Sequence, residues 1–301
     1  MRALPRHPLL TLALLVAASG LSASSAIAQR SSAEPAPTQS ATAQNADDDD
    51  LINADRPGIA DGSLTVGAGM FQAEVGLQDE RRADEGVRTR TRFVPTLLRL
   101  GLTDHLEARV ESNTFTDERA TDDAGASSSE SGLASVLLGF KWTIFDSGGD
   151  ARRSVGTIVR VAPPSGSNGF GTTHTTGDVR LAADWDFAPK LSLNPNVGVA
   201  RYEDSDGSTF GTALGALTLT YQPTPRLNPF VDLGYQSLEE PGGTWALALD
   251  AGVAYIVGRD VQLDVSAGTR AHGVSPARPF VAIGVSARHQ LFHRREQTTS
   301  H

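Results

Sequence analysis

The sequence predicts an all-β protein: a closed, antiparallel transmembrane β-barrel of about twelve strands that follows a disordered N-terminal segment. Three observations favour this fold class. Apolar and polar residues alternate with a period of two in segments that are mostly about 10–15 residues long, whereas strands of soluble sheets average about 5–6. Short turns and longer loops broadly alternate between these segments, as in outer-membrane barrels. The chain also begins with an export signal.

The N-terminus has the three parts of a secretory signal. Arg2 and Arg6 supply positive charge, residues 9–16 form a short apolar run, and residues 26–28 (Ala-Ile-Ala) form a cleavage site of small residues. The apolar run is too short to span a membrane as a helix. We therefore expect cleavage after Ala28 and export of the mature chain.

The segment after the signal is rich in Ser, Ala, Thr, Gln and Pro and ends in four consecutive aspartates at 47–50. It has too few apolar residues to form a core, so we expect it to be disordered. The expected divisions are a signal peptide at 1–28, a disordered acidic linker at 29–54, the outer-membrane β-barrel at 55–292 and a C-terminal tail at 293–301.

The clearest strand pair spans residues 244–270. Apolar residues, with Trp245 and Tyr255 near the ends, share one face of the first half, whereas small or polar residues such as Asp250 share the other. The alternation resumes after a short break at 258–260, which predicts an antiparallel hairpin. An apolar face with aromatic ends and small aliphatic residues between them favours a lipid belt over a soluble core.

The remaining strands follow the same pattern. Pro95 interrupts the second strand, where a bulge could change the phase of the alternation. The polar segment Thr116–Ser131 is expected to be a surface loop. An even strand number puts both termini at the periplasmic, short-turn end. Besides the hairpin, strands are expected at 70–78, 87–102, 106–115, 132–145, 152–162, 175–187, 191–203, 208–222, 226–238 and 278–291.

Composition excludes several kinds of site. The 301 residues include no cysteine, so disulfides and thiolate metal sites are excluded. The net charge of −9 argues against a nucleic-acid partner. The sequence contains no G-x-S-x-G or H-E-x-x-H motif, and the alternation puts Ser286 and His289 on opposite faces. We expect no catalytic residue, no metal site and no cofactor, and hence no enzyme.

Two motifs resemble a known family. The acidic run is followed by DRPGIADGS at 55–63 and by VGAGMFQAEVG at 66–76, and residues 95–110 follow P-x-L-L-R-x-G-L-x-D-x-x-E-x-R-V. These residues resemble the bacterial outer-membrane family named for a putative MetA pathway of phenol degradation, whose members are often called transporters. The resemblance spans essentially the whole mature barrel. It implies a Gram-negative outer-membrane barrel with a role in passage of small molecules, and the family name implies a link to aromatic degradation.

With the apolar faces on lipid, the charged residues of the other face would line a lumen. Basic residues concentrate on the second and third expected strands and acidic ones on the sixth and the ninth to eleventh, which predicts a transverse field. This placement rests on alternation alone, so an undetected bulge would reverse a segment. Glu74, Lys141, Arg160, Asp186 and Arg270 share this face. The candidate lumen-lining residues are Arg88, Arg90, Arg92, Glu107, Arg109, Glu111, Asp178, Arg180, Asp184, Asp232, Asp250, Asp264 and Arg288.

The expected function is passive passage of small molecules, with small charged or aromatic solutes as candidates, through this charged lumen. The expected partners are outer-membrane lipid and an unidentified small-molecule solute; the oligomeric state stays open. Two alternatives remain: a closed structural or surface-interaction barrel whose charges satisfy one another and, less favoured, an outer-membrane lipid-modifying enzyme. The sequence also leaves open whether Asp55–Gly69 plugs the periplasmic mouth.

Overall fold

The computed structural model of the chain describes residues 51–149, 152–167, 169–272 and 276–292. The expected signal peptide, the expected tail and the linker up to residue 50 lie outside these residues. The described strands form one antiparallel sheet. They are β1 (Met70–Asp84), β2 (Val87–Phe93), β3 (Thr96–Gly101), β4 (Leu106–Ser112), β5 (Phe115–Asp122), β6 (Ser127–Leu133), β7 (Leu137–Asp146), β8 (Arg153–Ala162), β9 (Thr176–Ala188), β10 (Leu191–Glu203), β11 (Thr209–Tyr221), β12 (Leu227–Gln236), β13 (Ala246–Ile256), β14 (Val261–His272) and β15 (Phe280–Gln290).

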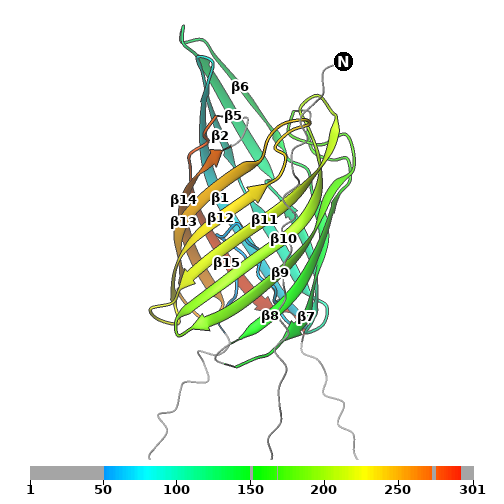
Figure 1. Cartoon of the computed structure of the whole chain (residues 1–301), viewed down its shortest axis with the longest axis vertical. Helices are drawn as coiled ribbons and strands as arrows, with labels where there is room; N and C mark the ends of the chain where they lie inside the picture. Colours follow the sequence, from blue (N-terminus) through cyan, green and yellow to red (C-terminus); the bar gives the residue numbers. More distant parts are fainter. Residues whose placement is uncertain (1–50, 150–151, 168, 273–275, 293–301) are drawn as a thin grey trace, which may run out of the picture. The chain divides into compact units, whose positions relative to one another are not determined.

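The sheet closes on itself because the last strand pairs with the first. β15 lies against β1 without a register shift from Met70↔Gln290 to Glu80↔Phe280. Figure 1 shows the strands winding obliquely around the resulting barrel. Closure leaves no unpaired edge in the barrel wall, which is a requirement for crossing lipid.

The barrel has twelve strands, three of which are interrupted once. β2 and β3 both pair with β1 and are separated at Val94–Pro95, and β4/β5 and β6/β7 are interrupted at the same level. Proline lacks the N–H that a ladder requires, so the break at Pro95 has a direct cause. The predicted fold class and strand number are therefore confirmed.

The segment Thr116–Ser131 is not a loop, which corrects the sequence-based prediction. Its residues pair with one another as β5 and β6, and β5 also pairs with β2. Ser, Thr and charged residues occupy both faces, so no apolar period of two was present to predict strands. Together with β2 and the end of β1 they form a sheet, residues 79–93 and 115–133, that we call the wing. Figure 1 shows β2, β5 and β6 rising beyond the rest of the barrel.

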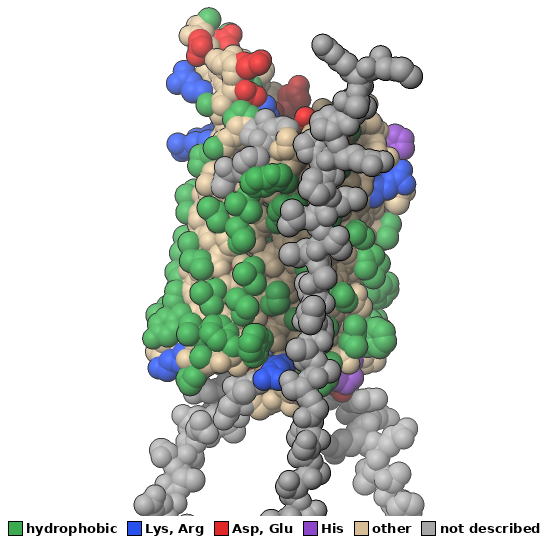
Figure 2. All heavy atoms as spheres, in the orientation of Figure 1, with side chains coloured by type: hydrophobic (Ala, Val, Ile, Leu, Met, Phe, Trp, Pro, Cys, Tyr) green, Lys and Arg blue, Asp and Glu red, His purple; other side chains and the backbone are tan. Residues whose placement is uncertain are grey.

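The outer surface of the barrel is an apolar belt. Val199 and Ile283 are 62% and 58% exposed although both are large and apolar. Trp185 and Tyr255 lie on this face near one end of their strands, where aromatic residues prefer the interface of a membrane. Figure 2 shows apolar side chains spread over the barrel below the charged wing. This is the surface of an outer-membrane barrel.

Both ends of the barrel chain lie at the end with the short turns. Met70 and Gln290 are paired at this end, where the connections β3–β4, β9–β10, β11–β12 and β13–β14 also lie. The wing lies at the opposite end. In outer-membrane barrels short turns face the periplasm, so the wing is extracellular. In the described part of the chain, no helix is long and apolar enough to span a membrane.

The wing should be dispensable for the barrel. Replacing Asp117–Glu130 by an Asn-Gly turn leaves the β1–β3, β3–β4 and β4–β7 ladders intact. We expect the shortened protein to keep heat-modifiable migration in gels and an unchanged urea midpoint of unfolding. A variant that no longer folds would show that the wing is required to close the barrel.

Candidate functional site

The segment before β1 lies inside the barrel, at its periplasmic end. We call residues 51–69 the plug. Ile52 donates its N–H to the carbonyl of Arg259 in the β13–β14 turn (2.8 Å), and Thr65 donates its hydroxyl to the carbonyl of Asp104 in the β3–β4 turn (2.7 Å). Between these points the plug donates backbone N–H groups to inward side chains on several strands. These bonds join Ile59 to Asp232 (2.9 Å), Asp61 to Asn196 (2.9 Å), Ser63 to Asp184 (2.7 Å) and Val66 to Glu107 (2.9 Å).

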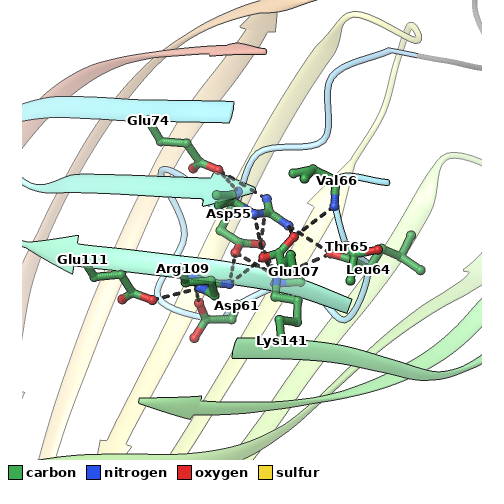
Figure 3. A network of polar contacts seen from close by, with 12 residues as sticks. Asp55, Asp61, Leu64, Thr65, Val66, Glu74, Glu107, Arg109, Glu111 and Lys141 are labelled. Carbon is green, nitrogen blue, oxygen red and sulfur yellow. Dashed lines mark hydrogen bonds and ion pairs between the residues drawn. The ribbon is translucent and has the colours of Figure 1, made fainter. Parts of the chain in front are cut away.

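The strongest attachment of the plug is the carboxylate of Asp55. It contacts Nη1 of Arg109 at 2.7 Å, Nζ of Lys141 at 2.8 Å and Nη1 of Arg99 at 3.7 Å. All three basic side chains are at most 1% exposed. Burial alone would raise the pKa of Asp55, but Arg99, Lys141 and Arg109 outweigh it and hold the pKa well below the usual range. Figure 3 shows Asp55 pointing into this cluster.

Two further carboxylates balance the cluster. Glu107 accepts from Nε of Arg99 at 2.9 Å, and Glu74 accepts the N–H of Arg56 at 2.8 Å and a bond from Nη1 of Arg99 at 3.3 Å. Three buried cations thus face Glu74 and Glu107 of the wall and Asp55 of the plug, and Arg109 also contacts Glu111 and Asp61. Loss of one partner from such a network costs about 3–5 kcal/mol because an uncompensated charge stays buried. The barrel wall therefore requires the plug for its own electrostatic balance.

Arg56 occupies a flat site made by two glycines. Gly76 and Gly284 face each other in the β1–β15 ladder, and a Cβ at either position would lie 2.5 Å from guanidinium atoms of Arg56. The guanidinium also contacts Asp264 at 3.1 Å. Glycine at these inward positions leaves room for the plug that any side chain would fill. The plug and the inner wall are thus complementary in shape as well as charge.

A second ionic network lies beside the first and is joined to it by Arg109, which contacts Glu111 at 2.9 Å and Asp61 at 3.1 Å. Arg160 contacts Glu111 and Asp178, each at 2.9 Å, and Asp61 of the plug at 3.5 Å. Arg180 joins it through Asp178 at 2.8 Å and Asp61 at 3.3 Å. The plug thus supplies a carboxylate to each network, Asp55 to one and Asp61 to the other.

Two cavities lie on either side of one stretch of the plug. The first, of about 440 Å³, is lined by Phe93, Arg278 and Phe280 at the base of the wing. The second, of about 450 Å³, is lined by Gln222 and Pro225 at the periplasmic β11–β12 connection. Both are bounded by residues 55–58, the Asp-Arg-Pro-Gly motif. The motif therefore forms a septum between an extracellular and a periplasmic vestibule.

A single family model matches both the septum and the barrel. The family model described as "Putative MetA-pathway of phenol degradation" matches residues 54–288, which include the plug from Ala54 onward. The chain belongs to this family. The resemblance inferred from the motifs is thereby confirmed.

Solved structures share the barrel fold with this family member. The COG4313 outer membrane channel from Pseudomonas putida F1 is 14% identical, over 77% of this chain and 99% of that one, with a TM-score of 0.57. The NanC porin (13% identical, 71% and 98% covered, TM-score 0.46) and the CymD monoaromatic hydrocarbon channel (11%, 76% and 90%, 0.38) are more distant in structure. Only the first of these structures supports the similarity of fold. No curated protein matches the sequence.

Most candidate lumen residues of this family member contact the plug or its networks. Glu107 and Arg109 belong to the Asp55 cluster, and Glu111, Asp178 and Arg180 to the second network. Asp184, Asp232 and Asp264 bind plug groups directly, through Ser63, Ile59 and Arg56. Arg288 contacts Asp260 in a periplasmic turn at 2.8 Å, and Asp250 pairs in register with Asp232 on the inner wall.

Arg88, Arg90 and Arg92 lie elsewhere, which corrects their predicted place in the lumen. They pair with Ala83, Arg81 and Asp79 of β1, which follow the exposed Leu77 at intervals of two and so lie on the same outward face. The change of phase expected at Pro95 does not occur: β2 and β3 pair with β1 in one continuous register, so the arginines share the outward face of Leu98 and Leu100. The three arginines therefore lie on the outer face of the wing.

Sequence reasoning missed Arg99, Asp55 and Asp61 as site residues. A signal for Arg99 was present: Leu98 and Leu100 alternate toward lipid after Pro95, so the arginine between them must face inward. The two aspartates lie in irregular chain, where no periodicity assigns a side chain to a face. Within the described residues, no group of His, Asp and Glu side chains is arranged to hold a metal ion.

Neutralising Asp55 should release the plug. Asp55→Asn leaves Lys141 and Arg109 without their shared carboxylate, and about 3 kcal/mol corresponds to about a 100-fold larger undocked fraction. The readout is the rate at which an impermeant maleimide labels Ser63→Cys, a position with 0% exposure in a chain without native cysteine. The matched control, Asp206→Asn in the β10–β11 turn, should leave the rate unchanged. Equal labelling of both variants would show that Asp55 does not hold the plug.

Proposed function

We propose that this barrel lets small molecules pass passively across the outer membrane and that the plug gates the passage. The observation that carries the proposal is the pair of vestibules within a closed barrel, separated at residues 55–58. A barrel with only a structural role would have no need for water-accessible chambers on both sides of a docked peptide. Passage requires no cofactor or catalytic group.

Family membership and fold support the same proposal. The family description concerns phenol degradation, and the structure from Pseudomonas putida F1 that shares the fold is described as an outer membrane channel. Neither assigns a solute to this chain. The solute class has to be argued from the walls of the vestibules.

The extracellular vestibule combines apolar and charged walls. Phe93, Leu97 and Phe280 supply apolar surface, whereas Arg180 and Asp250 supply charge. An aromatic ring can contact the phenylalanines while a polar substituent stays near the charged groups. We therefore propose small aromatic molecules with polar or anionic substituents as the solute class.

A reversible lock tests whether the plug is the gate. Oγ of Ser63 lies 2.6 Å from Oγ of Ser154 on β8, close enough for Ser63→Cys and Ser154→Cys to form a disulfide in a chain without other cysteines. We expect the oxidised protein to be silent in a planar lipid bilayer and the reduced protein to conduct. The two single cysteine variants should conduct under both conditions.

The outcomes of the lock separate the alternatives. Silence in the oxidised and reduced forms, and in the wild type, would favour a closed structural barrel. Equal conductance in all forms would mean that solutes pass a plug that stays in place.

The solute class is tested by current block. Contact between the benzoate ring and the phenylalanine rings of the extracellular vestibule is worth about 1 kcal/mol. Benzoate should therefore half-block the current at about a fivefold lower concentration than acetate. Phe93→Ala should remove this difference and leave block by acetate unchanged. Equal block by the two anions in the wild type would exclude selection for aromatic solutes.

A further inference from the structure

The two faces of the wing carry opposite charge. The pairings β1–β2, β2–β5 and β5–β6 contain no register shift, so each residue can be assigned to a face. The inner face carries Glu80, Arg82, Asp84, Glu118, Asp122 and Glu130. The outer face carries Arg81, Arg88, Arg90, Arg92 and Arg119 with Asp79 and Asp117. A basic outer face in a chain of net charge −9 is a local feature that the overall composition does not predict.

Three of these arginines stand in one row across the sheet. Arg90 pairs in register with Arg81 on one side and with Arg119 on the other. Like charges directly opposite each other destabilise a sheet. This row is therefore unfavourable for the protein alone and becomes favourable when an anion lies over it.

The carboxylates of the outer face are too few to neutralise it. Asp79 is shared by Arg81 at 3.5 Å, Arg92 at 3.0 Å and Arg90. Among the described residues, Arg88 and Arg119 form no ion pair. The guanidinium groups of Arg90 and Arg92 are also accessible, since their side chains are 44% and 45% exposed.

The basic face begins where the apolar belt ends. Phe115 and Leu133 are paired, outward and 51% and 58% exposed, and they are the last apolar residues of the belt on β5 and β6. Asp117 follows Phe115 on the same face after two residues and Arg119 after four, or about 7 and 13 Å along the strand. Figure 2 shows basic side chains just above the apolar surface at this end. This is the level of lipid headgroups in the outer leaflet.

A pocket on this face has the lining that a phosphorylated sugar requires. A cavity of about 330 Å³ lies between Arg90, Arg92, Arg119 and Asp117, and its wall is completed by residues 127–129, of which Ser127 and Ser129 share the outer face. Guanidinium groups bind phosphate through paired, charge-assisted hydrogen bonds, and serine hydroxyls can bond to sugar hydroxyls. We propose that the outer face of the wing binds the phosphorylated disaccharide headgroup of lipid A in the surrounding outer leaflet.

This site is separate from the proposed passage. The arginines face the lipid side of the wing, whereas the vestibule is reached from the opposite, acidic face. Binding of lipid A would hold the wing upright beside the barrel mouth. In the described sheet β6 pairs with β5 along one edge, and no strand pairs with its other edge.

The test is lipid retention by the purified full-length protein in detergent, measured by native mass spectrometry with added lipid A. The variant combines Arg90→Gln, Arg92→Gln and Arg119→Gln. The matched control, Arg153→Gln, Arg201→Gln and Arg226→Gln, removes the same charge at positions outside the wing. Heat-modifiable migration in gels verifies that each variant is folded.

We expect the wild type and the control to bind bisphosphorylated lipid A at least about 10-fold more tightly than dephosphorylated lipid A, and the wing variant to lose this preference. Inorganic phosphate at millimolar concentration should not displace the lipid. Retention of the preference by the wing variant, its absence in the wild type, or displacement by inorganic phosphate would each overturn the proposal.

Discussion

The carboxylate of Asp55 is the point on which the interior of this barrel depends. Three buried cations on β3, β4 and β7 surround it. Arg160 and Arg180 are linked to them, and these five cations receive only four carboxylates from the wall, which are Glu74, Glu107, Glu111 and Asp178. Buried ion pairs of this kind add little net stability, but they strongly disfavour arrangements in which one partner is missing. The network therefore specifies one place for the plug, and this place divides the lumen into two vestibules.

The fold was largely predictable because lipid imposes a simple rule on sequence. Every second residue of a membrane strand must be apolar, so the face of Trp245 and Tyr255 could be assigned from the alternation alone. The wing escaped the rule since neither of its faces lies in the hydrocarbon of the membrane. Ser127–Ser131 can therefore be paired strand without any apolar residue to indicate it.

The candidate site was predictable only in part. Inward positions such as Asp178 and Asp232 follow from alternation, but their partners lie in the plug, which has no period. Arg88, Arg90 and Arg92 face outward with Leu98 and Leu100, whereas Arg99 faces inward, because the register with β1 is unbroken across Pro95. Whether a proline interrupts a ladder with or without an inserted residue depends on backbone geometry, which the sequence does not show.

The position of Gly69 has a consequence for how the plug can move. Its N–H bonds to the carbonyl of Gly101 and its carbonyl accepts the N–H of Leu291, so it lies where the first and last strands meet. The plug is continuous with β1 and contacts the periplasmic turns at Arg259 and Asp104. A plug released from its ion pairs therefore stays tethered at the seam of the barrel, and the periplasmic mouth is its way out of the lumen and back.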